Sequence, residues 1–252
     1  GRPCVMVSLA RSGDSPESAG AVDLVLETQP ETRQLVITCN ESGRLAAAYV
    51  GNPRVQTVVL DHRTNDRSLA MTSSFTNMAL GATFLGFLGD PAAYLTLCAR
   101  LSGMCETLLE RHMGTLARIA RGSFRRAVFL GSGPRFGAAR ETALKMLEMT
   151  AGRLPTLAES YLGLRHGPMS YVHDDTLIVC FLSSDPLRRA YETDLIAELN
   201  QKKLGSSKLL IGEEIPQSLL LPGDTAIELP GLAQFGDDHT AVTGRPAAVA
   251  ID

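Results

Sequence analysis

Short apolar runs alternate with turn residues and with amphipathic stretches along this chain. Runs rich in Val, Ile and Leu predict buried strands, and most are followed by a turn and by apolar residues at helical spacing, which is the order of a parallel α/β sheet. Strands are expected at residues 5–7, 35–38, 55–60, 127–130, 176–181 and 209–212, and helices at 15–27, 91–121, 136–151 and 186–203. The pattern therefore predicts an α/β protein with two units joined by a long helix.

The order of these elements suggests domain boundaries. We expect a first α/β domain at 1–82, a helical connection at 83–121, a second α/β domain at 122–230, and a tail at 231–252. A doubly wound sheet normally has a strand and a helix before the position where the first strand is predicted, so we expect the first domain to be truncated at its N-terminus. The tail contains small residues, Gly and Pro without periodicity, and no element is assigned to it.

Composition narrows the class of partner. The chain has 252 residues and 44% hydrophobic content, enough for buried cores, and its net charge of -3 gives no basic stripe for nucleic acid. No run approaches ~18 apolar residues, and no signal peptide is recognisable, so neither a membrane span nor secretion is expected. The five cysteines form no CxxC pair, which argues against a disulfide framework or a zinc site and favours buried thiols in a reducing cytosol. We therefore expect a cytoplasmic protein whose partner is a small metabolite.

A serine-rich turn follows the first predicted strand. In the segment at 8–18, hydroxyls and free backbone N–H groups precede a helix, where the helix N-terminus attracts an anion. Ser12 and Ser15 could donate hydrogen bonds to a phosphate, Gly13 allows a close backbone approach, and Arg11 could add a charged contact. An alternative is that Ser15 is only a helix N-cap, and composition alone favours neither interpretation.

The second half contains a polar stripe and one distinctive histidine. Glu141, Lys145 and Glu148 are spaced to share one face of a helix, although for an arbitrary helix such a stripe is more often a solvated ion-pair surface. His166 lies at 164–168, where Gly and Pro predict a turn that leaves the imidazole free to point into a cleft. A single histidine is, by itself, more often a surface or packed residue.

Three segments together resemble a known family. SLARSGDSPES, NDRSLAMTSSFTNMAL and ETALKMLEMTAGRLPTLAESYLGLRHGPMS occur in the order found in sugar-isomerase (SIS) proteins, and most resemble tagatose-6-phosphate ketose/aldose isomerases and galactosamine-6-phosphate deaminase/isomerases. The isomerase half of glucosamine-6-phosphate synthase is a more distant relative. The resemblance covers residues 4–229 and implies a repeat of two SIS domains, each a parallel sheet flanked by helices, with the phosphosugar over the first domain.

The resemblance implies roles for particular residues. It puts Arg11, Ser12 and Ser15 at phosphate-loop positions, together with Gly13 between them. Thr72, Ser73 and Ser74 begin the helix on the other side of the sugar.

For catalysis, the resemblance implies that Glu148 moves a proton between neighbouring carbons through an enediol and that His166 opens the sugar ring. Lys145 would stabilise negative charge on an oxygen or keep Glu148 ionised, or it could be structural. Neither a metal nor an organic cofactor is implied. The family's earlier Ser/Thr loop would precede Gly1, and its final helix and catalytic lysine have no recognisable counterpart after Leu229.

Isomerisation and deamination share the first proton transfer, so the resemblance allows more than one activity. We favour hydrolytic deamination of galactosamine-6-phosphate to tagatose-6-phosphate and ammonia. A simple aldose–ketose phosphosugar isomerase and a non-catalytic phosphosugar-binding module remain as alternatives, and the sugar epimer is not determined. We also expect a homodimer or a higher homo-oligomer, with His166 of one chain completing the site of another, as the related synthase implies.

Overall fold

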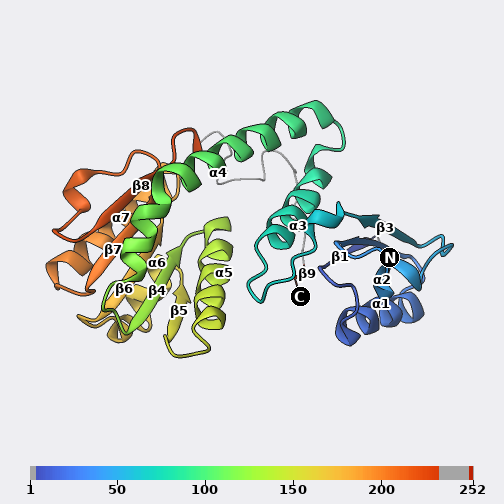
Figure 1. Cartoon of the computed structure of the whole chain (residues 1–252), viewed down its shortest axis with the longest axis horizontal. Coiled ribbons are helices and arrows are strands. Elements are labelled where there is room, and N and C mark those ends of the chain that lie inside the picture. Colours follow the sequence, from blue (N-terminus) through green and yellow to red (C-terminus); the bar gives the residue numbers. More distant parts are fainter. Residues whose placement is uncertain (1–3, 233–249, 252) are drawn as a thin grey trace. The chain divides into compact units, whose positions relative to one another are not determined.

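The computed structural model of the protein describes residues 4–232 and 250–251 (Figure 1). These residues divide into two compact units, 4–98 with 250–251 and 99–232, and the boundary lies within helix α4 (Pro91–Ala120). Most of the tail to which the sequence analysis assigned no element lies outside the described residues. Within the part of the chain that the structure describes, no helix combines the length and apolar content needed to span a membrane.

The first unit is a parallel sheet with helices on both faces. Its strands are ordered β3-β2-β1-β9, and β1 pairs with β2 over its full length. Its elements are β1 (Cys4–Ala10), α1 (Pro16–Thr28), β2 (Thr32–Thr38), α2 (Arg44–Ala47), β3 (Val55–Val59), α3 (Ser73–Thr83), two short 3-10 helices (His62–Thr64 and Phe84–Phe87), the first turns of α4, and β9 (Ala250–Ile251).

Helices pack on both faces of this sheet. On one face, α1 buries Ala19 and Val22 against Val36 of β2, and Leu45 of α2 joins the same cluster. On the other face, α3 approaches the sheet closely, since a Cβ on Gly81 would lie 3.4 Å from the side chain of Ile37. Together these contacts hold the loops at the carboxyl ends of the strands in fixed positions.

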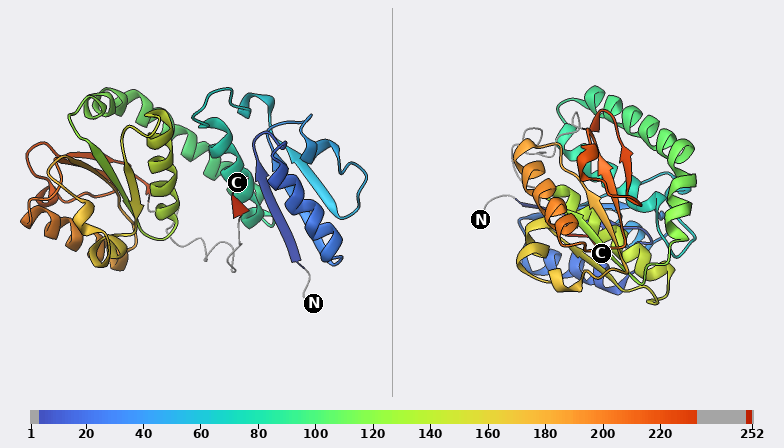
Figure 2. Two further views of the ribbon diagram at one scale, coloured as in Figure 1. Left: turned by 90° about the horizontal axis from the view of Figure 1, so that it is seen from below. Right: turned by 90° about the vertical axis from the view of Figure 1, so that its left-hand side faces the viewer.

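The second unit contains a five-stranded parallel sheet with the order β5-β4-β6-β7-β8 (Figure 2). Its elements after α4 are β4 (Arg126–Gly131), α5 (Pro134–Met149), β5 (Thr156–Glu159), α6 (Tyr161–His166), β6 (Thr176–Phe181), α7 (Pro186–Gln201), β7 (Ser207–Gly212), β8 (Thr225–Glu228) and two short 3-10 helices (Met169–Tyr171 and Gln217–Leu219).

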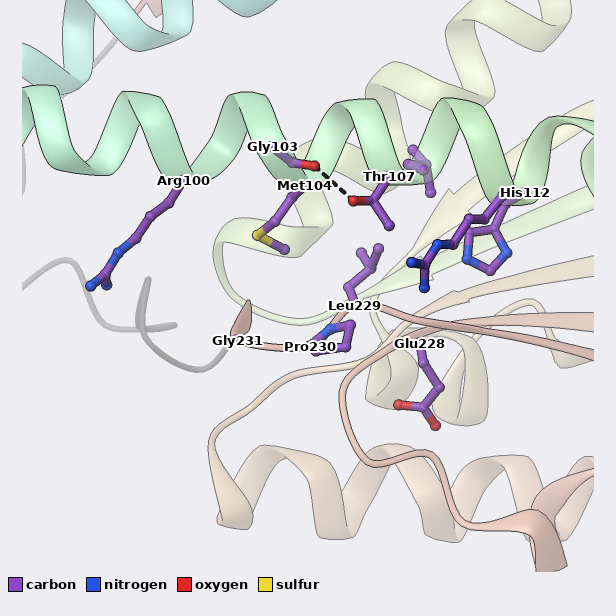
Figure 3. A pocket seen from close by; sticks show the side chains of 11 residues that line it. Arg100, Gly103, Met104, Thr107, His112, Glu228, Leu229, Pro230 and Gly231 are labelled. Atoms are coloured by element: carbon purple, nitrogen blue, oxygen red, sulfur yellow. Dashed lines mark hydrogen bonds between the residues drawn. The ribbon is translucent and has the colours of Figure 1, made fainter.

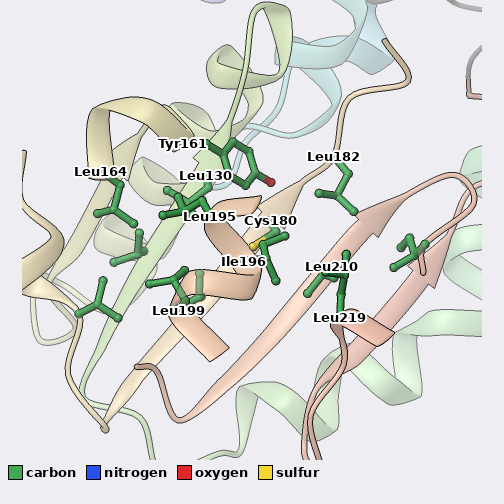
Figure 4. Packing of buried hydrophobic residues seen from close by; sticks show 14 residues of the cluster. Leu130, Tyr161, Leu164, Cys180, Leu182, Leu195, Ile196, Leu199, Leu210 and Leu219 are labelled. Atoms are coloured by element: carbon green, nitrogen blue, oxygen red, sulfur yellow. The ribbon is translucent and has the colours of Figure 1, made fainter. Parts of the chain in front are cut away.

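Two hydrophobic clusters occupy the two faces of this sheet. One is formed with α6 and α7, whose Tyr161, Leu164 and Leu195 pack on β4, β6 and β7 (Figure 4). The other is formed with α5 and the end of α4, where Ala143 and Leu116 cover the opposite face. A buried strand such as β6, with five of its six residues fully buried, needs apolar side chains on both faces, which is why its sequence does not alternate.

The predicted α/β class with parallel sheets flanked by helices is confirmed. The sequence pattern missed β5, β8 and α6, which have only four, four and six residues and so show little periodicity. The expectation of buried thiols holds for Cys39 and Cys180 but is wrong for Cys4 and Cys105, which are exposed. Cys4 is the first residue of β1, and Cys105 lies on an exposed face of α4, so neither side chain is covered.

Candidate active site

The loop between β1 and α1 leaves two serine hydroxyls available. Ser15 is the N-cap of α1, yet its side chain makes no capping hydrogen bond, so the alternative of a simple cap describes its position but not its contacts. The Ser12 hydroxyl oxygen accepts a hydrogen bond from the Asp14 amide at 3.3 Å. Gly13 has φ +67, a conformation that favours glycine. This loop therefore presents hydroxyls at the positive end of a helix, where an anion is favoured.

Arg11 joins this loop to the segment before α3. Its Nε donates to Met71 Sδ at 3.2 Å, and its Nη1 donates to Asn65 Oδ1 at 3.5 Å. The guanidinium is thus held by residues 54 and 60 positions away in sequence. The structure brings the predicted phosphate loop beside the start of α3, where Thr72 and Ser73 lie.

Asp66 already occupies the N-terminus of α3. Its Oδ2 accepts from the Ser74 amide at 2.8 Å and from the Ser74 hydroxyl at 2.9 Å. The hydrogen bond from this amide lowers the pKa of Asp66, outweighing the opposite effect of desolvation, and the Thr72 and Ser73 amides act in the same direction. Thr72 and Ser73 are the N-cap and the first residue of α3, so they lie at the start of this helix as the resemblance implies.

The predicted polar stripe of α5 is a tight ionic group. Lys145 Nζ lies 2.8 Å from Glu148 Oε2 and 3.4 Å from Glu141 Oε1, and all three side chains are largely shielded from solvent. Partial burial lowers the pKa of Lys145, but the hydrogen bond to Glu148 and the charges of Glu141 and Glu148 outweigh it, so the pKa is raised. Lys145 is therefore a fixed cation beside the Glu148 carboxylate.

This ionic group is not at the carboxyl edge of the second sheet. In a sheet of the order β5-β4-β6-β7-β8, ligands usually bind where the strand order reverses, at the carboxyl ends of β4 and β6. Helix α5 runs from the carboxyl end of β4 back toward the amino end of β5, and Lys145 and Glu148 lie in its last turns. The second unit thus offers its carboxylate from a helix surface rather than from the usual position.

His166 is the last residue of α6 and is exposed, and the predicted turn is formed by Gly167 and Pro168 directly after it. Ser160 is the N-cap of this helix, and its hydroxyl accepts a hydrogen bond from the Gly163 amide at 2.9 Å. Among the described residues, no hydrogen bond or ion pair joins His166 to Glu148.

Next to His166, Arg165 Nε lies 2.8 Å from Glu198 Oε2 and its Nη2 lies 2.8 Å from Asp194 Oδ2. These two ion pairs fasten α6 to α7. Sequence reasoning missed Arg165 and Asp66. Both partners of Arg165 lie on another helix, 29 and 33 residues away, so spacing gave no signal. Asp66 lies eight residues before Ser74, which does not fit a capping-box spacing.

The second unit also has a cavity of about 500 Å³ between α4 and the end of β8 (Figure 3). Arg100, Met104 and His112 line it from α4, and Leu229 and Pro230 line it from the opposite side. None of the residues predicted for the active site lines this cavity.

These observations define a class of protein with two parallel α/β units. One helix follows a serine-rich loop, and another carries a partly buried carboxylate–lysine pair. No family model matches the chain. It is 39% identical over 244 residues to the D-galactosamine-6-phosphate deaminase AgaS of Escherichia coli, covering 95% of this chain and 62% of that protein. A Streptomyces coelicolor protein, provisionally given the same name, is 41% identical over 252 residues, covering 98% of this chain and 63% of that protein.

Solved structures agree. The crystal structure of tagatose-6-phosphate ketose/aldose isomerase from Escherichia coli matches with a TM-score of 0.85 and 36% identity, over 96% of this chain and 65% of that chain. The chain thus spans somewhat less than two thirds of the length of these relatives. Over nearly its whole length, the chain is thus similar in sequence and fold to proteins named as galactosamine-6-phosphate deaminases and tagatose-6-phosphate ketose/aldose isomerases.

Proposed function

We propose that the protein is an amino-sugar-6-phosphate deaminase/isomerase that converts galactosamine-6-phosphate and water to tagatose-6-phosphate and ammonia. The observation that carries this proposal is the 2.8 Å pair of Lys145 and Glu148 on α5, in a chain whose relatives are named as this deaminase and as the related isomerase. The pair supplies one carboxylate that can take and return a proton, and one cation beside it.

The chemistry needs a single shuttle base. Once the ring is open, with His166 assisting that step, the Glu148 carboxylate removes the proton from C2 of the aldehyde form. The electron pair moves into a C1–C2 double bond, and the C1 oxygen takes up a proton. Glu148 then returns its proton to C1, which leaves an imine at C2, and water adds to the imine and releases ammonia to give the ketose. Lys145 stabilises the negative charge that develops on the substrate oxygen.

Substrate binding is assigned to the first unit. Ser12 and Ser15 donate their hydroxyl hydrogens to the 6-phosphate, and the backbone at Gly13 lets the phosphate approach the N-terminus of α1. Arg11 contributes positive charge, and the side chains of Thr72 and Ser73 contact the sugar. Three observations support these roles. The Ser15 side chain makes no capping hydrogen bond, the Ser12 hydroxyl oxygen accepts one from the Asp14 amide, and Arg11 contacts the segment before α3.

A second candidate function is simple aldose–ketose isomerisation of a 6-phosphosugar. One observation favours it, namely the likeness to a structure named as a tagatose-6-phosphate ketose/aldose isomerase. The two activities differ only in whether C2 carries nitrogen or oxygen, so the same Glu148 would serve both.

The site is proposed to be completed in a homodimer or a larger homo-oligomer, with His166 supplied by a second copy. The helix that carries the ionic group also has exposed apolar side chains, since Leu144, Leu147 and Met149 of α5 are 45%, 39% and 63% exposed. A second copy that covered them would also exclude water from Glu148. As an enzyme of phosphorylated sugars it would act in the cytoplasm.

The proposal is tested by incubating the protein with galactosamine-6-phosphate and with glucosamine-6-phosphate while ammonia and ketose phosphate are assayed separately. Equal amounts of ammonia and ketose from the galacto substrate are expected. In a parallel incubation with an aldose phosphate, ketose formed there while neither amino sugar releases ammonia would establish the isomerase instead. Binding of phosphosugar without turnover would make the chain a binding module.

A further inference from the structure

Three consecutive carbonyl groups of the β1–α1 loop are held by the segment that follows β2. The Arg11 carbonyl oxygen accepts from the Cys39 amide at 3.2 Å, and the Gly13 carbonyl oxygen accepts from the Leu45 amide at 2.9 Å. Between them, the Ser12 carbonyl oxygen accepts from Asn40 Nδ2 at 2.9 Å. Two of these bonds come from the backbone, whereas the middle one depends on a side chain.

Asn40 is itself fixed in place. Its Nδ2 also lies 3.5 Å from Asp14 Oδ2, and its Oδ1 accepts from the Ser42 hydroxyl at 2.9 Å and from the Ser42 amide at 3.3 Å. Every hydrogen-bonding group of this amide side chain is therefore engaged. The orientation of the amide, with its nitrogen toward Ser12, follows from the Ser42 hydrogen bonds to its oxygen.

The two segments also meet without space between them. A Cβ on Gly43 would collide with the Ser12 carbonyl oxygen, and a Cβ on Gly13 would lie 3.2 Å from Thr38 Oγ1. The Asp14 carboxylate, which could repel a phosphate, is engaged by the Arg44 amide at 2.9 Å. Packing and charge on this side of the loop are thus arranged around the segment at 39–45.

The position of these carbonyls fixes the direction of the loop's N–H groups. In a trans peptide the C=O group and the following N–H group point in opposite directions. Because the carbonyl oxygens of Arg11, Ser12 and Gly13 are turned toward the segment at 39–45, the amides of Ser12, Gly13 and Asp14 are turned away from it. Successive amides that point to one side form a site for an anion.

The Ser12–Gly13 peptide is the one that could reverse. Rotation of this peptide changes ψ of Ser12 and φ of Gly13, and glycine accepts either sign of φ at little cost. After such a flip the Ser12 carbonyl, rather than the Gly13 amide, would face the ligand. The hydrogen bond from Asn40 opposes this flip, and it is the only side-chain bond to that carbonyl among the described residues.

We propose that Asn40 is a positioning residue of the phosphate loop, which holds the Ser12–Gly13 peptide so that the Gly13 amide donates to the 6-phosphate. Asn40 does not touch the substrate in this account. The inference rests on the proposed function only in taking the β1–α1 loop as the phosphate site. It assigns a role to a residue in the segment after β2, which none of the sequence motifs singled out.

The test measures binding rather than turnover. Galactitol 6-phosphate keeps the phosphate but has no carbonyl to react, so its affinity is measured by calorimetry, with inorganic phosphate as a second probe. Asn40→Ala is expected to weaken binding about 10- to 100-fold, the loss that corresponds to one hydrogen bond to a charged group. In the 15N-labelled wild type the Gly13 amide signal should move downfield on titration, and in the variant this shift should be lost.

Two control variants separate positioning from general damage. Ser42→Ala removes the hydroxyl bond to Asn40 Oδ1 but keeps the bond from the Ser42 amide, which still orients the Asn40 amide toward Ser12. Asn52→Ala removes an asparagine that accepts from the Arg54 amide at 3.0 Å elsewhere in the same unit. Both should bind within about threefold of wild type. If Asn40→Ala also binds within twofold and keeps the Gly13 shift, the inference is wrong, while the phosphate site itself stands. If wild type binds neither probe, the proposed phosphate site is wrong.

Asn40→Asp serves where the alanine variant fails to fold. It keeps the shape, but at pH 7 its carboxylate cannot donate to the Ser12 carbonyl. Its affinity relative to wild type should therefore be low at pH 7 and should recover as the pH falls toward about 4, where the protonated acid can donate. A ratio that does not change with pH would contradict the positioning role, because a purely structural defect does not respond to this proton.

Discussion

On helix α5, Lys145 lies one turn before Glu148, and its Nζ is 2.8 Å from Glu148 Oε2. The pair is only partly exposed, at 21% and 29% of the two side chains, and Glu141 contacts the same ammonium from the other side at 3.4 Å. A carboxylate held beside a fixed cation on a helix surface is the feature that the proposed chemistry depends on.

Lys145→Met should lower kcat about 100-fold, because it removes the charge that stabilises the developing oxyanion. Glu141→Gln is the matched control: it changes the longer contact and should cost less than about fivefold. Since the pKa of Lys145 is raised from 10.5, the ammonium stays charged as pH rises through neutral and mildly alkaline values. The ratio of kcat between wild type and Lys145→Met should therefore be constant from pH 6 to pH 9 in steady-state assays. A ratio that falls to about one within that range would contradict the role given to Lys145.

Ser12→Ala combined with Ser15→Ala should weaken binding of 6-phosphorylated sugars, since each lost hydrogen bond to the phosphate costs about 1.5–3 kcal/mol. Glu148→Gln should leave the same affinity within a few fold. Calorimetry with a 6-phosphosugar separates the two effects. Equal affinity of the double variant and wild type would mean that the phosphate binds elsewhere.

Asp66→Ala should reduce the free energy of unfolding of the first unit by about 1 kcal/mol, because the Ser74 amide loses its acceptor at the start of α3. The folded-state pKa of Asp66 is lowered, so the ionised carboxylate stabilises the fold above its unfolded-state value of about 3.9. This stabilisation is lost as the pH falls through the folded-state pKa. Urea unfolding at several pH values should show the gap between wild type and variant closing below about pH 4, and a gap that widens there would contradict this account.

Mixing Glu148→Gln chains with His166→Ala chains tests whether two copies share a site. In randomly mixed dimers, half of the dimers are mixed and one of their two sites has both native residues, so about a quarter of the sites should regain activity. Subunit exchange is verified by mass spectrometry before the assay. Activity that stays at the level of the separate variants would place Glu148 and His166 of one chain in one site.

The parallel sheets and the long helix could be predicted because their strands and helices have clear apolar periodicity. The stripe of Glu141, Lys145 and Glu148 could be predicted from helical spacing, and the structure pairs all three. Helix α6 could not be predicted in this way, since its six residues contain fewer than two turns and end beside Gly167.

Contacts between distant segments were also invisible in the sequence. The sequence spacing does not predict the hydrogen bonds from Arg11 to Met71 or from Asn40 to Ser12. These contacts depend on how two loops meet at the edge of a sheet. The direction of α5, which carries Glu148 away from the carboxyl ends of the strands, follows from the strand order and became apparent only with the fold.

The central claim is that Glu148 is the base that moves the substrate proton. Its most direct test is Glu148→Gln, assayed both for ammonia and ketose release from galactosamine-6-phosphate and for binding of galactitol 6-phosphate. The amide keeps the shape of the carboxylate but cannot take the proton, so turnover should fall about 10²–10⁴-fold while affinity changes by no more than a few fold. Turnover above a tenth of the wild-type rate would contradict the claim and would require another residue as the base.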